Sequence, residues 1–269
     1  MSGDQGGASA LSGRLTPIVQ RLYSLAAPEN TLAAVRKAID SGADYAEVDV
    51  QQTADGVVVL LHDTDLKRVG RVSSRIGDLT FDEARRLDVG SHFAPSYSGE
   101  RIPTLDEVIA LSRGKIRLNI ELKTSGQGGA LARAVGRIVR EEDFAPSCLV
   151  TSFDRESLLE LRRSPPSPRT GLIIAQALGD VSRLEFDALS VRADWLTQGV
   201  LRAAHRAGKE VHVWTVNDPR EMARLMKMGV DNVITDDPDA MIRVRDGWAR
   251  LSAVERLLLA SSLLLGVDP

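Results

Sequence analysis

Five polar residues in this sequence stand in or directly after apolar runs that are typical of buried strands: Glu47, Asp49, His62, Glu121 and Lys123. A carboxylate withdrawn from water costs free energy unless a cation or hydrogen bonds compensate it. Surface acids just beyond strand ends are the ordinary alternative, and any one of these residues would fit it. The combination favours a functional site.

The three carboxylates have the chemistry of a metal site. Side chains alternate along a strand, so Glu47 and Asp49 face the same side of theirs. Glu121 ends a later strand, and we expect it at the same end of the sheet as Glu47 and Asp49. Three carboxylates around one point repel one another without a cation, and oxygen ligands suit Mg²⁺ or Ca²⁺. A zinc site would need clustered histidine or cysteine, which the sequence lacks.

His62 is the candidate for proton transfer. It follows the run Val57 to Leu61, which we expect to return opposite Glu47 and Asp49 as a hairpin. A lone histidine is more often structural, but one beside a metal can shuttle a proton. The other histidines have no such neighbours and are interpreted as structural, although one of them could line the barrel interior: His92, His205 and His212.

Two cations are candidates for holding an anionic group of a substrate. Lys123 and Arg21 would neutralise anionic oxygens on which charge builds in a transition state. The alternative for Arg21 is an ordinary surface cation.

The elements that must position these residues alternate along the chain. Helical stretches separate most of the apolar runs Ile18–Val19, Tyr45–Val50, Val57–Leu61, Ile116–Leu122, Cys148–Phe153, Gly171–Ile174, Ala188–Val191, Val211–Val216 and Asn232–Thr235. A parallel crossover needs a dozen or more residues, and the gap after Val50 is too short for one. The run Val57 to Leu61 is therefore a hairpin return. Eight parallel strands remain, which predicts an α/β fold, a TIM (β/α)8 barrel with a hairpin after the second strand.

Capping signals place several helices between these strands. Asn30 or Thr31 can cap a helix over Leu32 to Ser41, and Thr80 can cap one from Phe81 with Glu83 as reciprocal partner. Asp218 and Pro219 open a further helix in the same way. The long stretch from Asp63 to Leu105 shows helix and loop signals but no clear strand.

Length and composition set the wider limits. With 269 residues, 43% of them hydrophobic, the chain can bury the core of one barrel, predicted over residues 16–250. A net charge of −3 and a pI near 5.9 give no basis for binding nucleic acid. The single cysteine, Cys148, cannot form an internal disulfide and is expected to be a buried, inert thiol. The sequence gives no indication of the oligomeric state.

The two ends of the chain differ from the barrel region. Residues 1–15 read as a flexible leader and lack the layout of a signal peptide. Residues 251–269 read as a helical tail that packs on the barrel, with contact to a membrane surface as the alternative. The tail falls short of the roughly 20 apolar residues that span a bilayer, so no transmembrane segment is expected. A cytoplasmic location, or membrane association on the cytoplasmic side, follows as the expectation.

From about Ile18 to Pro238 the chain resembles the glycerophosphodiester phosphodiesterase family, part of the phospholipase C-like phosphodiesterases. The motifs that carry the resemblance are Pro28-Glu29-Asn30-Thr31, Gly42 to Val50, Thr53 to Gly56, His62-Asp63, Ile102 to Leu105, Glu121-Leu122-Lys123, Thr151-Ser152-Phe153, Trp214 to Asn217 and Asp231 to Asp236.

The resemblance implies a reaction and a substrate. In that family the metal binds a phosphodiester oxygen and the glycerol hydroxyl, which attacks phosphorus, and two histidines share the proton transfers. Lys123 and Arg21 would neutralise the non-bridging phosphate oxygens. The alcohol leaves, and water opens the cyclic intermediate to glycerol 3-phosphate. Phe153 and Trp214 resemble the apolar wall that packs on the glycerol or the leaving alcohol, with ordinary barrel packing as the alternative.

One departure from the family pattern bears on the activity. The family has His-Arg-Gly where this chain has Gln20-Arg21-Leu22. Glutamine can bind a phosphate oxygen but cannot transfer a proton near neutral pH, and a lost acid/base step costs ~10²–10⁴-fold in rate. Either the rate is reduced or another group or water substitutes.

Three functions therefore stay open from the sequence. The first is metal-dependent hydrolysis of glycerophosphodiesters. The second is a non-catalytic protein that keeps the metal and phosphate site. The third is a related phospholipase-type enzyme that acts on longer lipids.

Overall fold

The computed structural model describes residues 16–19, 26–124, 128–175, 181–252 and 255. The predicted leader, most of the predicted helical tail, and the residues Gln20, Arg21 and Leu22 lie outside the described residues.

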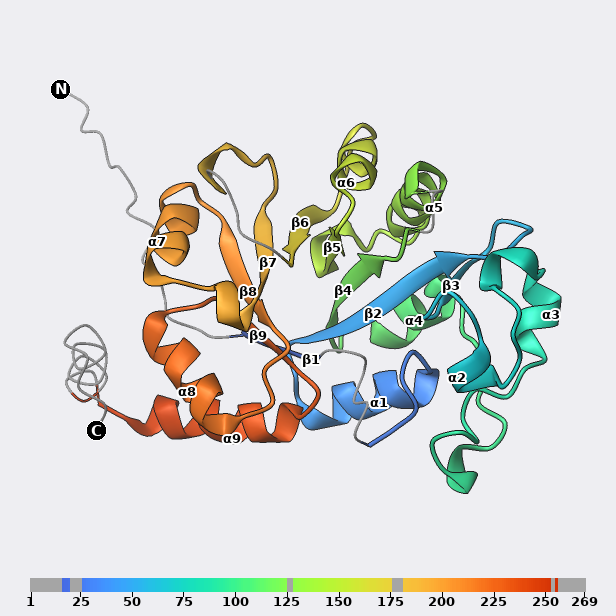
Figure 1. Ribbon diagram of the computed structural model, residues 1–269, viewed down its shortest axis with the longest axis horizontal. Coiled ribbons are helices and arrows are strands. Elements are labelled where there is room, and N and C mark those ends of the chain that lie inside the picture. The colour runs from blue at the N-terminus through green and yellow to red at the C-terminus, as the bar shows by residue number, and fades with distance from the viewer. Residues whose placement is uncertain (1–15, 20–25, 125–127, 176–180, 253–254, 256–269) are drawn as a thin grey trace.

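Eight parallel strands close into a barrel, as the sequence predicted (Figure 1). Each pairs in parallel with two neighbours, and the ring closes where the first strand pairs with both the second and the last. The barrel strands are β1 (Thr16–Val19), β2 (Tyr45–Gln52), β4 (Arg117–Leu122), β5 (Cys148–Ser152), β6 (Arg169–Ile174), β7 (Ala188–Arg192), β8 (Glu210–Trp214) and β9 (Asn232–Thr235). Their bounds differ from the predicted runs by a few residues at most.

The hairpin after the second strand is also confirmed. β3 (Val58–Leu60) pairs antiparallel with β2, with Val50 opposite Leu60 and Gln52 opposite Val58. Thr53 closes the turn, because its backbone N–H and hydroxyl both bind the carbonyl oxygen of Val57. β3 runs back from the carboxyl end of β2 and ends opposite Val50, and Leu61 N–H then donates to the Asp49 carbonyl oxygen. The next residue, His62, therefore lies close to the metal-ligand candidates of β2.

Helices separate the strands and cover the outside of the barrel (Figure 1). They are α1 (Leu32–Ser41), α4 (Leu105–Ser112), α5 (Gly128–Glu141), α6 (Arg155–Arg162), α7 (Gln198–Arg206), α8 (Pro219–Met228) and α9 (Pro238–Arg250). Of the two predicted caps for α1, Thr31 is the one used, since its hydroxyl accepts from Ala34 N–H. Asn30 has another partner in the site. The cap at Asp218, with Pro219 in the first turn, is confirmed.

A small helical layer lies over the hairpin between β3 and α4. It contains α2 (Lys67–Gly70), the 3₁₀ turns η1 (Ile76–Asp78) and η2 (Pro95–Tyr97), and α3 (Phe81–Arg85), which opens with the predicted Thr80–Glu83 capping box. It has no strand, as predicted, and its apolar side chains pack on Val59 and Leu61 in a core separate from that of the barrel. We refer to residues 64–104 as the insert.

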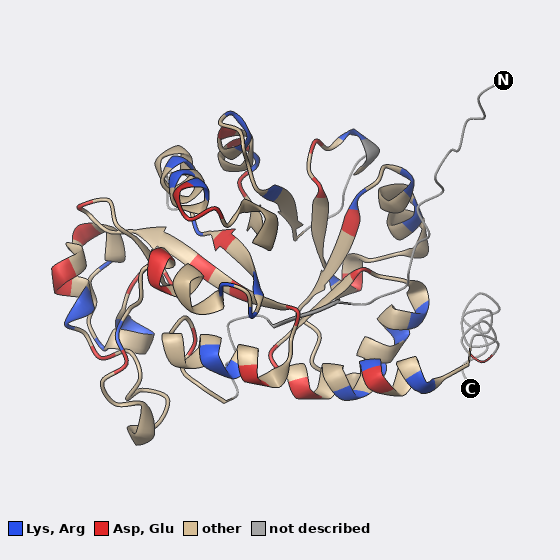
Figure 2. Ribbon diagram, turned by 180° about the vertical axis from the view of Figure 1, so that it is seen from behind, with Lys and Arg blue, Asp and Glu red and all other residues tan. Residues whose placement is uncertain are grey.

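Charged residues of both signs alternate along the outer helices, whereas acidic residues also interrupt strands of the sheet (Figure 2). The outward faces of the strands are apolar and pack on the helices, for example through Val48, Val50 and Ile120. The inward faces are polar, with Glu47, Asn119 and other side chains pointing into the barrel. In the part of the chain that the structure describes, no helix is long and apolar enough to cross a bilayer.

Candidate active site

Three carboxylates meet at the carboxyl end of the barrel. One oxygen each from Glu47, Asp49 and Glu121 lies within 4.8 Å of the others. All three side chains are buried, and Asp49 pairs with Glu121 in the register of β2 and β4. The register thus explains the cluster, because neighbouring strands put these inward positions at one height.

Lys123 is shared between two of these carboxylates. Its Nζ lies 3.0 Å from Asp49 Oδ1 and 2.6 Å from Glu121 Oε1. Burial alone would lower the pKa of Lys123, but the charges of Asp49 and Glu121 outweigh burial and raise that pKa. The ammonium group is therefore charged near neutral pH.

Asn30 holds Asp49 from the other side. Its Nδ2 donates to Asp49 Oδ2 at 2.9 Å, and its Oδ1 accepts from the backbone N–H of Asp49 at 3.0 Å. The backbone of Asn30 has a φ of +54°, a left-handed conformation that asparagine tolerates better than most residues. The sequence offered Asn30 as one of two possible helix caps and did not indicate that it orients Asp49.

The geometry fits a divalent cation. Asp49 Oδ1 is buried and accepts no hydrogen bond of good geometry from a described residue, although the Lys123 ammonium is close. Burial and the nearby charge of Asp49 raise the pKa of Glu121, as expected for acids that are crowded together. The donors are all carboxylate oxygens, which suit a hard cation, and the cluster can hold a divalent metal.

His62 belongs to a chain of four charged or ionisable side chains. Its Nδ1 lies 2.7 Å from Asp63 Oδ1, and Asp63 Oδ2 accepts from Arg68 Nε at 2.7 Å. Arg68 in turn donates to both oxygens of Glu29, at 2.9 and 2.5 Å. Burial acts to raise the pKa of Asp63, but hydrogen bonds from Arg68 and His62 prevail and lower it to about 2. An ionised Asp63 therefore orients the His62 ring.

Gln51 fixes the backbone that carries His62. Its Nε2 donates toward the carbonyl oxygens of Leu61, His62 and Asp63 at 2.9, 3.4 and 2.7 Å. Gln51 is buried, with 4% of its surface exposed. The segment after β3 is thus held from its backbone by Gln51 and from its side chains by Arg68.

An aromatic pair forms one wall of the cavity above the cluster. Phe153 and Trp214 meet edge to face with ring centroids 6.1 Å apart, and Trp214 Nε1 donates to the Ser190 carbonyl oxygen. Phe153 is 53% exposed, which is unusual for a core phenylalanine. The cavity has a volume of about 190 Å³, and Glu47, Glu121, Lys123 and His62 also line it.

The structure thus brings together all the predicted site residues that it describes. Gln20 and Arg21 lie outside the described residues. Two of the other histidines lie away from the carboxyl end of the barrel: His205 binds Asp231 at 2.8 Å, and His212 sits deeper in the barrel beside Glu210. Burial raises the pKa of the Cys148 thiol to about 12. Sequence reasoning missed Asn30, Glu29 and Arg68 as supports of the site. Glu29 and Asn30 stand in the motif Pro28 to Thr31, which was the one signal for them, and Arg68 stands in no motif.

A closed (β/α)8 barrel with carboxylates, a lysine and a histidine around a cavity at its carboxyl end has the architecture of a barrel enzyme with a metal site. Residues 21–240 match the Glycerophosphoryl diester phosphodiesterase family. The chain belongs to that family.

Known proteins resemble the chain over most of its length. It is 35% identical over 233 residues to YhdW of Bacillus subtilis, covering 84% of this chain and 96% of that protein. It is 34% identical over 241 residues to a glycerophosphodiester phosphodiesterase of Caldanaerobacter subterraneus, covering 86% of this chain and 98% of that one.

Among solved structures, a phosphodiesterase of Oleispira antarctica, in complex with its product sn-glycerol-3-phosphate, superposes with a TM-score of 0.81 at 27% identity. The match covers 86% of this chain and 96% of that one.

Proposed function

We propose that this protein is a metal-dependent phosphodiesterase that hydrolyses glycerophosphodiesters to glycerol 3-phosphate and an alcohol. The observation that carries the proposal is the carboxylate cluster with Lys123 and His62 around one cavity. Membership of the family and the product bound by the Oleispira antarctica relative support the same substrate class.

Each described residue of the candidate site has a part in this reaction. Glu47, Asp49 and Glu121 would hold Mg²⁺ or Ca²⁺, which when bound neutralises the carboxylates and polarises a phosphate oxygen. Lys123 stabilises the negative charge on the non-bridging oxygens. Asp63 occupies Nδ1 of His62, so proton exchange with the substrate falls to Nε2.

The aromatic pair contributes binding rather than charge. Phe153 and Trp214 form an apolar wall on which the carbon atoms of the glycerol unit can pack. Arg21, as the sequence predicts, would add a second cation at the phosphate.

Glycerol 3-phosphate release from glycerophosphocholine, measured with Mg²⁺ or Ca²⁺ and after EDTA treatment, tests the proposal. We expect release only with the metal. A Glu121→Gln variant should release little or no product at metal concentrations that just saturate wild type. Release that persists unchanged in EDTA, with a demetallated protein, would contradict the proposal.

Gln20 gives the non-catalytic alternative its specific support, because it replaces a proton-transfer residue of the family. The change Gln20→His should raise the rate, approaching ~10²-fold by the usual value of a positioned acid or base. Leu22→Gly in addition should raise it further by making room for the phosphate. If neither variant turns over faster and wild type binds glycerol 3-phosphate with metal but hydrolyses nothing, the protein is a binding protein.

A further inference from the structure

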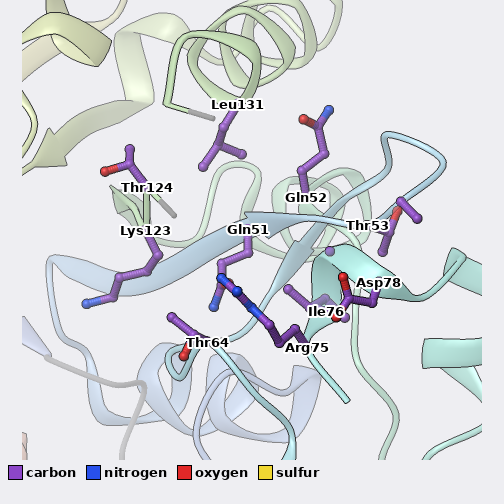
Figure 3. A pocket seen from close by; sticks show the side chains of 12 residues that line it. Gln51, Gln52, Thr53, Thr64, Arg75, Ile76, Asp78, Lys123, Thr124 and Leu131 are labelled. Atoms are coloured by element: carbon purple, nitrogen blue, oxygen red, sulfur yellow. The ribbon is translucent and has the colours of Figure 1, made fainter. Parts of the chain in front are cut away.

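A second pocket adjoins the active site on the side of the insert (Figure 3). It has a volume of about 300 Å³ and lies between the ends of β2 and β4, the η1 turn and the start of α5. We call it the side pocket. Its principal polar residues are Gln51, Thr64, Arg75, Asp78, Lys123 and Thr124.

The side pocket is continuous with the catalytic residues along two strands. Gln51 lies two positions after Asp49, and Lys123 two positions after Glu121, on the same inward faces. Lys123 also lines the cavity that holds the carboxylates, so it stands between the two spaces. Two residues of strand correspond to about 6–7 Å, so a substrate held at the metal ligands reaches the side pocket with its next group.

Both hydrogen-bond donors and acceptors line the side pocket. Gln51 uses its Nε2 to hold the His62 segment. Its side-chain oxygen, Oε1, accepts no hydrogen bond from a described residue. This oxygen belongs to a side chain only 4% exposed, so it is an acceptor built into the pocket wall. The hydroxyls of Thr64 and Thr124 can both donate and accept.

Arg75 supplies the charged donor. It is exposed, and Figure 3 shows its side chain extending across the pocket from the loop before η1. Among the described residues, none forms an ion pair or a side-chain hydrogen bond with its guanidinium group. The carboxylate of Asp78 also faces the pocket, which makes it unsuited to a strongly anionic group.

On this basis, and resting on the proposed function, we propose that the side pocket binds the leaving alcohol of the diester and selects polyhydroxylated alcohols such as glycerol and inositol. Adjacent hydroxyls of a polyol can donate to Gln51 Oε1 and accept from Arg75 at once. None of the described residues that line the pocket is aromatic, whereas quaternary ammonium groups such as choline are recognised by aromatic rings. The glycerol 3-phosphate unit then occupies the wall of Phe153 and Trp214.

Steady-state kinetics of the metal-loaded protein with glycerophosphoinositol, glycerophosphoglycerol and glycerophosphocholine tests the proposal. Wild type should show the lower KM for the two polyol diesters. In Arg75→Ala, KM for these two should rise about tenfold, the usual effect of losing one hydrogen bond to a charged group, with kcat unchanged. Thr64→Val should act in the same direction and more weakly. For glycerophosphocholine, KM should change less than twofold in either variant.

Arg86→Ala is the matched control, since it removes an exposed cation from the same insert without touching the pocket. Equal KM values for all three diesters, unaltered in Arg75→Ala and Thr64→Val, would overturn the side-pocket proposal while leaving the proposed function standing. If no diester is hydrolysed, the proposed function fails. Calorimetric binding of the same diesters then decides the pocket, because a preference for inositol that Arg75→Ala abolishes supports it and equal affinities refute it.

Discussion

Both ends of the barrel interior carry charged side chains: the amino end, which we call the base, and the carboxyl end, which we call the mouth. The charges are compensated differently at the two ends. At the base, Arg169 lies 2.9 Å from Glu210, which also binds His212 at 3.3 Å, and Arg117 stacks on the ring of Tyr45 at 4.1 Å. At the mouth, three carboxylates lie within 4.8 Å of one another, and Lys123 is shared between Asp49 and Glu121.

The buried polar atoms that lack a hydrogen-bond partner also differ between the base and the mouth. At the base, the buried atoms without a hydrogen bond to a described residue are an imidazole nitrogen of His212 and an amide oxygen of Asn232. At the mouth, the corresponding atom is a carboxylate oxygen of Asp49. A charge cluster that is paired within the protein supports the fold, whereas acids crowded around one lysine invite an external cation.

The largest expected effect is a loss of activity for a substitution at the mouth that a substitution elsewhere does not cause. His62→Ala should lower kcat by ~10²–10⁴-fold, because it removes a proton-transfer group, and should leave the melting temperature almost unchanged. His205→Ala, which breaks a histidine–carboxylate pair of 2.8 Å away from the mouth, is the control and should keep its kcat. A His62→Ala protein that melts much earlier but retains its rate would show that His62 is a packing residue.

A smaller loss of activity should follow when the support of His62 is removed. Arg68→Met breaks the link between Asp63 and Glu29 and should lower kcat about tenfold or more, the usual effect of losing a side chain that orients a functional group, with KM little changed. The pH profile of kcat should shift as well, since Asp63 no longer has a fixed position.

Two further variants check that reading of Arg68. Arg68→Lys should recover only part of the rate, because one ammonium group cannot serve two carboxylates in the same geometry. Arg113→Met, which breaks a surface pair with Glu142 at 2.7 Å, should leave kcat and its pH profile as in wild type. Equal behaviour of the Arg68 and Arg113 variants would remove Arg68 from the site.

At the base, the expected effect is on stability alone. Glu210→Gln weakens the contacts to Arg169 and His212 and should lower the free energy of unfolding by about 1 kcal/mol, because both partners of the ion pair are partly exposed. Urea denaturation measures the change. Loss of activity at saturating metal without loss of stability would break the distinction between base and mouth.

The smallest effect concerns acid stability. The pKa of Asp63 is lowered to about 2, below the ordinary aspartate value of 3.8, so its ionised form stabilises the folded state fully above pH 3.8. That stabilisation is lost as the pH falls through about 2. Asp63→Asn should therefore be less stable than wild type at pH 6, and the difference should shrink as the pH falls from 4 to 2.

The control for that titration is Asp40→Asn, which changes an exposed carboxylate on α1. Its stability relative to wild type should stay constant over the same pH range. A constant difference for Asp63→Asn as well would mean that the ionised Asp63 does not stabilise the fold.

The sequence predicted most of the mouth because side-chain alternation along a strand and the alignment of parallel strands follow simple rules. Glu47 and Asp49 share a face by alternation, and Glu121 reaches them because parallel strands align their carboxyl ends. The supports were out of reach of these rules. Arg68 is 39 positions from Glu29, and its pairing depends on the path of the loop after β3. Asn30 satisfied a cap pattern in the sequence, while in the structure Thr31 caps the helix and Asn30 holds Asp49.

The side pocket was equally invisible in the sequence. Arg75 stands in a loop without a motif, and only the packing of the insert against the ends of β2 and β4 brings it near Gln51. Long-range packing of irregular segments has no period from which to predict it.

Calorimetric titration of the demetallated protein with Mg²⁺ and Ca²⁺ tests the central claim most directly, with Glu121→Gln and Glu210→Gln compared side by side. Both variants remove one negative charge from a glutamate on an inward strand face. Binding should weaken by at least ~10²-fold in Glu121→Gln, which loses a ligand, and should match wild type in Glu210→Gln. Equal affinities in wild type and Glu121→Gln, or no binding to wild type at millimolar metal, would contradict the assignment of the mouth as a metal site.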